Sequence, residues 1–151
     1  MSQTDLRSSE ITESRLADWV ADWYRALDRH DDFDDLLPYL VEDGVEFHFP
    51  EGVFRGREEF GRWYDAVTNR FFDEKHTVTK VVAQPWNGDR TTVQIVVNWQ
   101  ATIWDAPEPA SKWLGFDAYQ TWEIVRDDRG RPRLRTYVVN NLQPMPGSAS
   151  L

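Results

Sequence analysis

The first regular apolar pattern of the chain has residues spaced three or four positions apart: Leu16, Trp19, Val20, Trp23 and Leu27. This spacing puts them on one side of a helix, so we predict a helix over residues 11–28, with Thr12 or Ser9 as its cap. A second, short apolar pattern between residues 33 and 40 predicts another helix, with Pro38 in its first turn or at a break.

Residues 44–72 change period twice. Val45, Phe47 and Phe49 alternate with Glu46 and His48, which is typical of a half-buried strand. Proline and glycine residues after Phe49 then interrupt this alternation. Helical spacing returns in an aromatic stripe: Phe60, Trp63, Tyr64, Val67 and Phe71. The stretch therefore predicts a short strand, a tight turn and a helix.

From residue 75 onward the pattern is that of strands. We expect long strands over 75–84, 90–104, 112–126 and 133–142, with Asn87-Gly88 as a hairpin turn and Gly115 as a candidate bulge. One face of the second strand is apolar: Val93, Ile95, Val97, Trp99, Ala101 and Ile103. Helices followed by antiparallel strands predict an α+β fold, in which a curved sheet closed by helices encloses a cavity.

The chain is expected to form a single domain over residues 10–143, with a disordered N-terminus over 1–9 and a disordered tail over 144–151. No segment has the apolar core of a signal peptide or the length of a membrane span, so we expect a cytoplasmic protein.

Charge and composition narrow the classes of partner. The net charge is −9 and the arginines are scattered among acids, which argues against nucleic acid and anionic membranes. There is no cysteine, and His30, His48 and His76 lack the spacing of a metal motif, so we expect no metal site. No glycine-rich phosphate loop or nucleophile elbow is present, which favours chemistry without a cofactor.

Three segments carry a family resemblance: WYRALDRHDDFDDLLPYLVEDGVEFHFPEG, RGREEFGRWY and KHTVTKVV. With the order of elements, they resemble the NTF2-like superfamily and, within it, the SnoaL-like group, over about residues 11–142. The resemblance implies a cone in which a curved mixed or antiparallel sheet wraps around three N-terminal helices and an internal pocket. It also implies a homodimer through the outer sheet face. The superfamily includes isomerases, dehydratases, cyclases and epoxide hydrolases as well as non-catalytic carriers, so the fold leaves the function open.

The resemblance also suggests where catalytic residues lie. The positions used by ketosteroid isomerases fall near Trp23, Phe47 and Thr121, which cannot do that chemistry, although a shift of one residue brings in Tyr24, Glu46 or His48. Scytalone-dehydratase-like members place an aspartate near the end of the first helix and a histidine at the start of the first long strand. These positions match Asp28 and His76. A carboxylate bonded to an imidazole fixes its tautomer and makes it a general base.

Other residues are secondary candidates. His48 faces away from its aromatic neighbours on the first strand, and Asp117 shares a strand face with Tyr119 that lines either the cavity or the outside of the sheet. Asn140 or Asn141 faces inward if the last strand is regular. Aromatic side chains are expected to fill the core or to line the pocket: Trp23, Phe47, Phe60, Trp63, Trp99 and Tyr119.

Two functions remain open from the sequence. The first is a cofactor-independent isomerase, dehydratase or cyclase acting on a small hydrophobic, oxygenated ring compound, with His76 and Asp28 as the acid–base pair. The second is a non-catalytic ligand-binding or assembly module with the same fold, whose pocket would lack paired titratable groups. We favour the enzyme.

Overall fold

The structure is a computed structural model that describes residues 11–151. Its helical elements are α2 (Glu13–Asp28), α3 (Phe33–Leu36), the 3-10 turn η1 (Leu37–Tyr39) and α4 (Gly56–Thr68). Its strands are β1 (Glu46–Phe49), β2 (Gly52–Arg55), β3 (Phe71–Ala83), β4 (Arg90–Ile103), β5 (Lys112–Arg126) and β6 (Pro132–Pro144). The predicted disorder of residues 1–9 and the possible cap at Ser9 lie outside the described residues.

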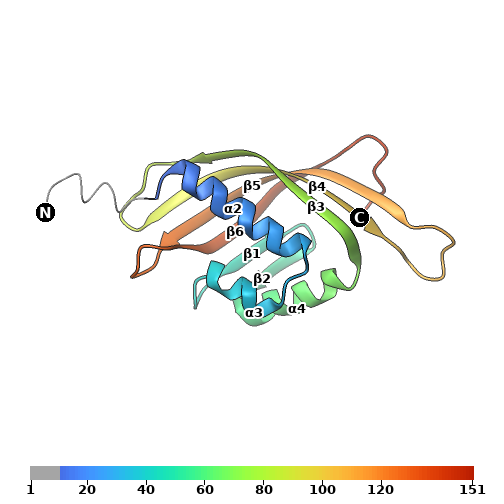
Figure 1. Cartoon of the computed structure of the whole chain (residues 1–151), viewed down its shortest axis with the longest axis horizontal. Helices are drawn as coiled ribbons and strands as arrows, with labels where there is room; N and C mark the ends of the chain where they lie inside the picture. Colours follow the sequence, from blue (N-terminus) through green and yellow to red (C-terminus); the bar gives the residue numbers. More distant parts are fainter. Residues whose placement is uncertain (1–10) are drawn as a thin grey trace, which may run out of the picture.

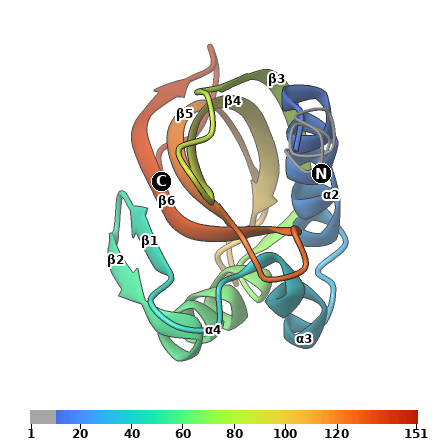
Figure 2. The same cartoon turned by 90° about the vertical axis from the view of Figure 1, so that its left-hand side faces the viewer.

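The strands form one six-stranded sheet in the order β2-β1-β6-β5-β4-β3. β1 runs parallel to β6, and the other neighbouring strands are antiparallel. The long strands β3 to β6 curve around an interior, with α2 against β3 on one side and α3, α4 and the β1–β2 hairpin on another (Figures 1 and 2). The predicted α+β cone with a curved mixed sheet is confirmed.

The first helix begins and packs as its sequence predicts. The Thr12 side chain accepts a hydrogen bond from the backbone N–H of Arg15, which satisfies one of the free donors of the first turn. The buried face of α2 includes Leu16, Val20, Trp23 and Tyr24. That face lies against the inside of the sheet, where Trp19 meets Trp122 edge-on at 6.1 Å between ring centroids.

The middle of the chain differs from its prediction in two ways. The break after Phe49 is itself the second strand of a hairpin, because β2 pairs antiparallel to β1. Helix α4 ends at Thr68, so Phe71 belongs to β3 and not to the helical stripe. The pairing of β3 with β4 shifts register between Phe72 and Lys75, which is a bulge, and Asp73 there has a left-handed φ of 51°.

The predicted bulge at Gly115 is wrong, because Gly115 pairs in register with Gln100. Its missing side chain serves close packing instead. A Cβ at this position would lie 2.5 Å from the Trp113 ring and 2.8 Å from the sulfur of Met145. A real bulge lies in β6, where Tyr119 pairs with Asn141 but Gln120 pairs with Val139, leaving Asn140 as the extra residue.

The C-terminal residues 144–151, for which the sequence predicts disorder, make hydrogen bonds to the start of β5 in the structure. The backbone N–H of Met145 donates to the carbonyl oxygen of Gly115, and that of Ala149 donates to Trp113. The Ser148 hydroxyl also accepts from the backbone N–H of Gly115. These bonds attach the tail to the start of β5, which the composition of the tail gave no means to foresee.

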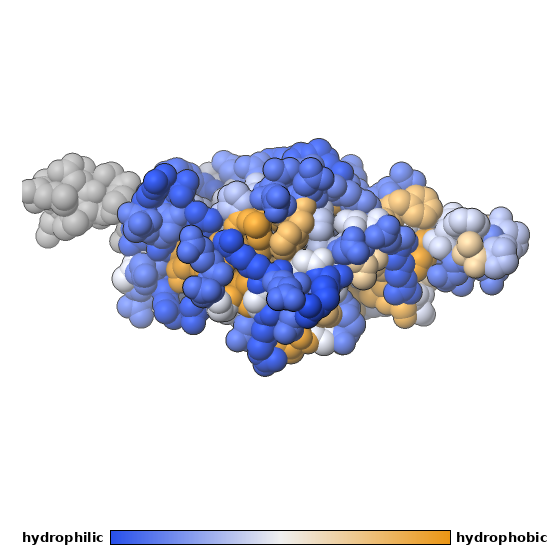
Figure 3. All heavy atoms as spheres, turned by 90° about the horizontal axis from the view of Figure 1, so that it is seen from below, coloured by the Kyte–Doolittle hydropathy of each residue, from blue (hydrophilic) through white to orange (hydrophobic). Residues whose placement is uncertain are grey.

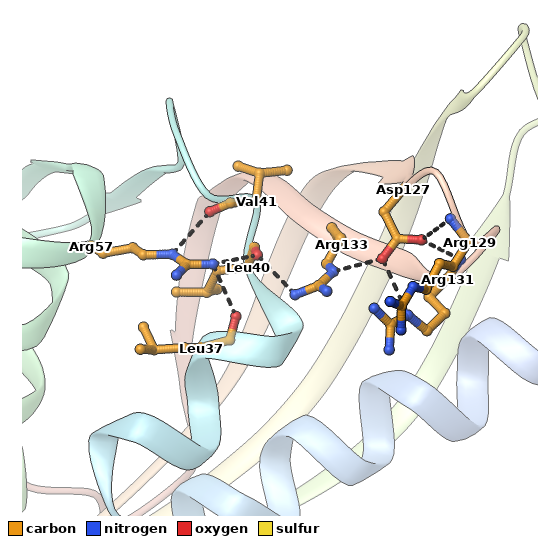
Figure 4. A network of polar contacts seen from close by, with 8 residues as sticks. All are labelled: Leu37, Leu40, Val41, Arg57, Asp127, Arg129, Arg131 and Arg133. Carbon is orange, nitrogen blue, oxygen red and sulfur yellow. Dashed lines mark hydrogen bonds and ion pairs between the residues drawn. The ribbon is translucent and has the colours of Figure 1, made fainter.

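Two arginines and an aspartate tie the helical layer to the sheet (Figure 4). Arg57 of α4 donates to the carbonyl oxygens of Leu37, Leu40 and Val41, which lie in and just after the 3-10 turn η1. Arg133 of β6 joins the same segment to Asp127, since it donates to both Leu40 and the Asp127 carboxylate. This network holds α3 and α4 over the sheet.

The surface seen from the helical side is mostly hydrophilic, with apolar patches between polar ones (Figure 3). Within residues 11–151, no helix combines the length and the apolar character that crossing a membrane requires.

Candidate active site

A cavity opens between the inner face of the sheet and the helices, with a volume of about 140 Å³. Most of its wall is apolar: Leu27, Phe49, Trp63, Tyr64, Val67, Phe71, Val97, Trp99, Ala118, Tyr137, Val139, Leu142 and Leu151. Polar side chains are few, and among them are Glu74, His76 and Gln120. Such a site accepts a small, largely apolar molecule and orients it with a few polar groups.

Asp28 and His76 meet at the wall of this cavity. The Nδ1 atom of His76 lies 2.5 Å from Oδ1 of Asp28, and the backbone N–H of His76 donates to Oδ2 at 2.9 Å. Because a carboxylate only accepts, Nδ1 carries the proton of this bond and Nε2 is the basic nitrogen of the neutral ring. The two side chains are 12% and 19% exposed, so this strong interaction is formed largely away from water.

Aromatic rings flank the imidazole of His76. The Tyr24 ring stacks on it at 4.6 Å between centroids, and the Trp99 ring lies 6.2 Å away at a similar tilt. Within residues 11–151, Nε2 has no hydrogen-bond partner. The ring is thus fixed by Asp28 and its neighbours while its second nitrogen stays free.

A buried hydrogen-bond chain lies next to this pair. Tyr24 and Trp122 both donate to Oε1 of Gln120, at 2.9 and 2.8 Å, and the Tyr137 hydroxyl lies 2.8 Å from that of Tyr24. Since Tyr24 gives its only proton to Gln120, Tyr137 must donate to Tyr24. Burial is the main cause that raises the pKa of Tyr24 well above its usual range and that of Tyr137 to about 12, so both stay neutral.

A second carboxylate–imidazole pair lies beside the first. Nε2 of His30 lies 2.6 Å from Oε2 of Glu74, and the indole of Trp99 donates to Oε1 of Glu74 at 3.1 Å. The pairs are crossed: Asp28 and His30 come from the end of α2, whereas His76 and Glu74 come from β3. Glu74 and His76 line the same cavity.

Local backbone features bring these groups together. Helix α2 ends at Asp28, and His30 adopts a left-handed φ of 52°, which turns the chain back toward β3 as in common helix C-caps. On β3, the bulge at Asp73 allows both Phe71 and Glu74 to face inward, although residues three positions apart lie on opposite faces of a regular strand.

The secondary candidates lie in different places. Tyr24 is in the buried chain under the cavity. His48 points away from it and bonds to Glu46 on the same strand, and Asp117 lies on the outer sheet face, where it accepts from Asn98. Asn140 is exposed and donates to Thr121. The assumption of a regular last strand is wrong, because the bulge at Asn140 lets both it and Asn141 face outward.

The expected pocket wall also needs correction. Trp63 and Trp99 line the cavity, as expected. Trp23, Phe47 and Phe60 are buried in the core behind it, where Phe47 stacks on Phe60 at 4.1 Å. Tyr119 lies on the outer face and is 43% exposed, because even-numbered residues of β5 face inward at this point.

Sequence reasoning missed Gln120, Glu74 and Tyr137. Gln120 had a usable signal, since it is a single polar residue on the strand face that Ala118 and Trp122 make apolar. The sequence signal for Glu74 and His30 is weaker: each lies two residues from a member of the predicted pair Asp28 and His76. Within the described residues, no group of three or more His, Asp or Glu is placed to hold a metal ion.

The sequence matches the SnoaL-like domain family over residues 20–131, which is more than half of the chain. The chain belongs to the SnoaL-like family. The predicted resemblance is thereby confirmed at the level of the family.

Solved structures share the fold of this SnoaL-like protein at low identity. One is hexachlorocyclohexane dehydrochlorinase LinA-type3 from Novosphingobium barchaimii LL02, with 18% identity, a TM-score of 0.74 and 99% of each chain covered. Another, from Novosphingobium aromaticivorans DSM 12444, is provisionally assigned as a scytalone dehydratase, with 17% identity, a TM-score of 0.69 and coverage of 96% of this chain and 89% of that one. No curated protein matches the sequence. These similarities show the fold alone.

Proposed function

We propose that this SnoaL-like protein is a cofactor-independent acid–base enzyme of the lyase or isomerase type, acting on a small hydrophobic molecule. The observation that carries the proposal is the hydrogen bond between Asp28 and His76 at the cavity wall. The two solved structures above support it, since one is a dehydrochlorinase and the other is provisionally a dehydratase.

His76 is the proposed general base. Its Nε2 takes a proton from a carbon of the substrate, and the electrons of the broken C–H bond form a carbon–carbon double bond. Either a leaving group departs from the adjacent carbon with its bonding electrons, or an adjacent carbonyl becomes an enolate. Asp28 stabilises the imidazolium that results, and a base of this kind contributes about 10²–10⁴-fold in rate.

The alternative, a non-catalytic binding module, predicts a pocket without paired titratable groups. The described cavity is lined by one member of each of two such pairs: His76, which is paired with Asp28, and Glu74, which is paired with His30. This difference favours the enzyme. The homodimer through the outer sheet face stays a prediction.

The test is proton exchange in heavy water. A panel of small ring compounds, some enolisable and some with a hydroxyl or halide next to an acidic C–H bond, is incubated with the protein and followed by NMR. We expect exchange or elimination that His76→Ala and Asp28→Asn reduce by about 10²–10⁴-fold. His48→Ala is the matched control, because His48 lies outside the cavity. If a substrate is found and His76→Ala turns it over at the full rate, the proposal is wrong.

A further inference from the structure

Gln120 combines deep burial with an unused donor. The residue is only 3% exposed and lies on the inner face of β5. Its Oε1 atom accepts two hydrogen bonds, from Tyr24 and from Trp122. Because an indole N–H can only donate, the oxygen must be the atom that faces Trp122, and the orientation of the amide is fixed.

The amide nitrogen of Gln120 is the unsatisfied half of the group. Within residues 11–151, Nε2 makes no hydrogen bond, and it is not among the fully enclosed polar atoms. Gln120 lines the cavity, and its Oε1 is already taken by Tyr24 and Trp122, so Nε2 is the amide atom left for a ligand there. Because Nε2 has no protein partner, an acceptor on a bound ligand gains a hydrogen bond by meeting it.

The Gln120 amide and His76 line the same cavity. Tyr24 connects the two groups, because its ring stacks on the imidazole and its hydroxyl bonds to the Gln120 amide. Both groups line one cavity whose remaining wall near them is apolar, including Val97, Ala118 and Val139. A base and an amide donor thus face the same small space.

We propose that the Nε2 of Gln120 is a ligand-binding donor that selects compounds bearing a carbonyl oxygen next to an acidic C–H bond. The oxygen accepts from Nε2 while the C–H bond faces His76. As the proton moves to His76, the C–H electrons form a carbon–carbon double bond and the carbonyl becomes an enolate oxygen, which the amide stabilises. The catalytic part of this inference rests on the proposed function, whereas the binding part does not.

The test compares two nearly isosteric probes, acetophenone and α-methylstyrene, which differ in having C=O or C=CH₂ beside the ring. Their dissociation constants are measured by NMR titration, and the ratio of the two constants cancels effects on general affinity. We expect Gln120→Leu to reduce the preference for the ketone by about 2- to 10-fold relative to wild type. Gln120→Glu keeps the oxygen that Tyr24 and Trp122 require and replaces Nε2, so it should show the same loss when its carboxylate is ionised. Gln94→Leu, the same change on the exposed outer face, should leave the ratio unchanged.

The inference is overturned if both Gln120 variants keep the wild-type ratio, or if wild type binds neither probe. If Gln120→Leu does not bind α-methylstyrene, its ratio of dissociation constants cannot be measured, and the ratio for Gln120→Glu alone decides whether the inference holds. His76→Ala should keep the wild-type ratio, which separates this inference from the proposed function. A ratio that depends on Gln120 without any His76-dependent exchange would retain the binding site and refute only the enzyme.

Discussion

The direction of the hydrogen bonds between Tyr24, Gln120 and Tyr137 predicts that two similar substitutions differ in cost. In Tyr24→Phe, the Tyr137 hydroxyl loses the Tyr24 oxygen to which it donates and remains buried, at 6% exposure of the residue, while Gln120 keeps Trp122. In Tyr137→Phe, the Tyr24 hydroxyl still donates to Gln120 and loses only a bond that it accepted. A net hydrogen bond is worth about 1 kcal/mol and a buried unsatisfied donor costs about 1–3 kcal/mol.

We therefore expect Tyr24→Phe to lower the free energy of unfolding by about 2–3 kcal/mol and Tyr137→Phe by about 1 kcal/mol. The double variant should be no less stable than Tyr24→Phe alone, because it removes the stranded hydroxyl. Urea denaturation followed by tryptophan fluorescence measures all three. Tyr119→Phe is the control, since its hydroxyl is on the exposed face, and it should change stability by less than about 0.5 kcal/mol.

The reasoning is refuted if Tyr137→Phe costs as much as Tyr24→Phe, or if the costs of the single variants add in the double variant. The dependence of unfolding stability on pH in the alkaline range gives a second check. The pKa of Tyr137 is about 12 in the folded protein against 10.0 for a free tyrosine. The unfolded chain therefore loses this proton first, and stability should fall between about pH 10 and 12, less steeply in Tyr137→Phe.

Two further substitutions test the scaffold. Burial alone would raise the pKa of Asp127, but the Arg131 backbone N–H, the Arg133 side chain and the Arg129 backbone N–H together lower it to about 2. Its contribution to stability is present above the ordinary value of 3.8 and is lost as the pH falls toward about 2, so the deficit of Asp127→Asn should shrink over that window in acid denaturation. Asp73→Val places a β-branched residue at a left-handed φ and should lower the unfolding free energy by about 1–2 kcal/mol in urea, whereas Asp73→Gly should not; equal effects of both would contradict the assigned bulge.

Periodicity was sufficient for most of the fold. The apolar stripe of α2 and the alternation in β4 depend only on local spacing, so the elements and the buried face of β4 follow directly from the sequence. The irregular positions in the strands do not follow from periodicity. The bulges at Asp73 and Asn140 come from pairing between strands, and they decide which side chains of β3 and β6 face the interior.

The candidate site also contains residues that the sequence predicts and residues that it does not. The family resemblance predicts Asp28 and His76, because the end of a helix and the start of a strand can be aligned with a known pattern. Glu74 and Gln120 depend on contacts between distant segments: Glu74 with His30, and Gln120 with Tyr24. Alternation separates the two faces of β5 without showing which one is inside, so the sequence does not exclude Tyr119 from the pocket.

The central claim is that Asp28 holds the proton on Nδ1 of His76 and leaves Nε2 as a free base toward the cavity. The most direct measurement is a nitrogen-15 NMR spectrum of the imidazole rings, recorded at a pH at which the rings are neutral, with His76→Ala used to assign the signals. We predict for His76 a protonated Nδ1 and an unprotonated Nε2, with the Nε2 signal shifting when acetophenone is added. A neutral ring that carries its proton on Nε2 would contradict the account, because that nitrogen could not then accept a proton from a substrate.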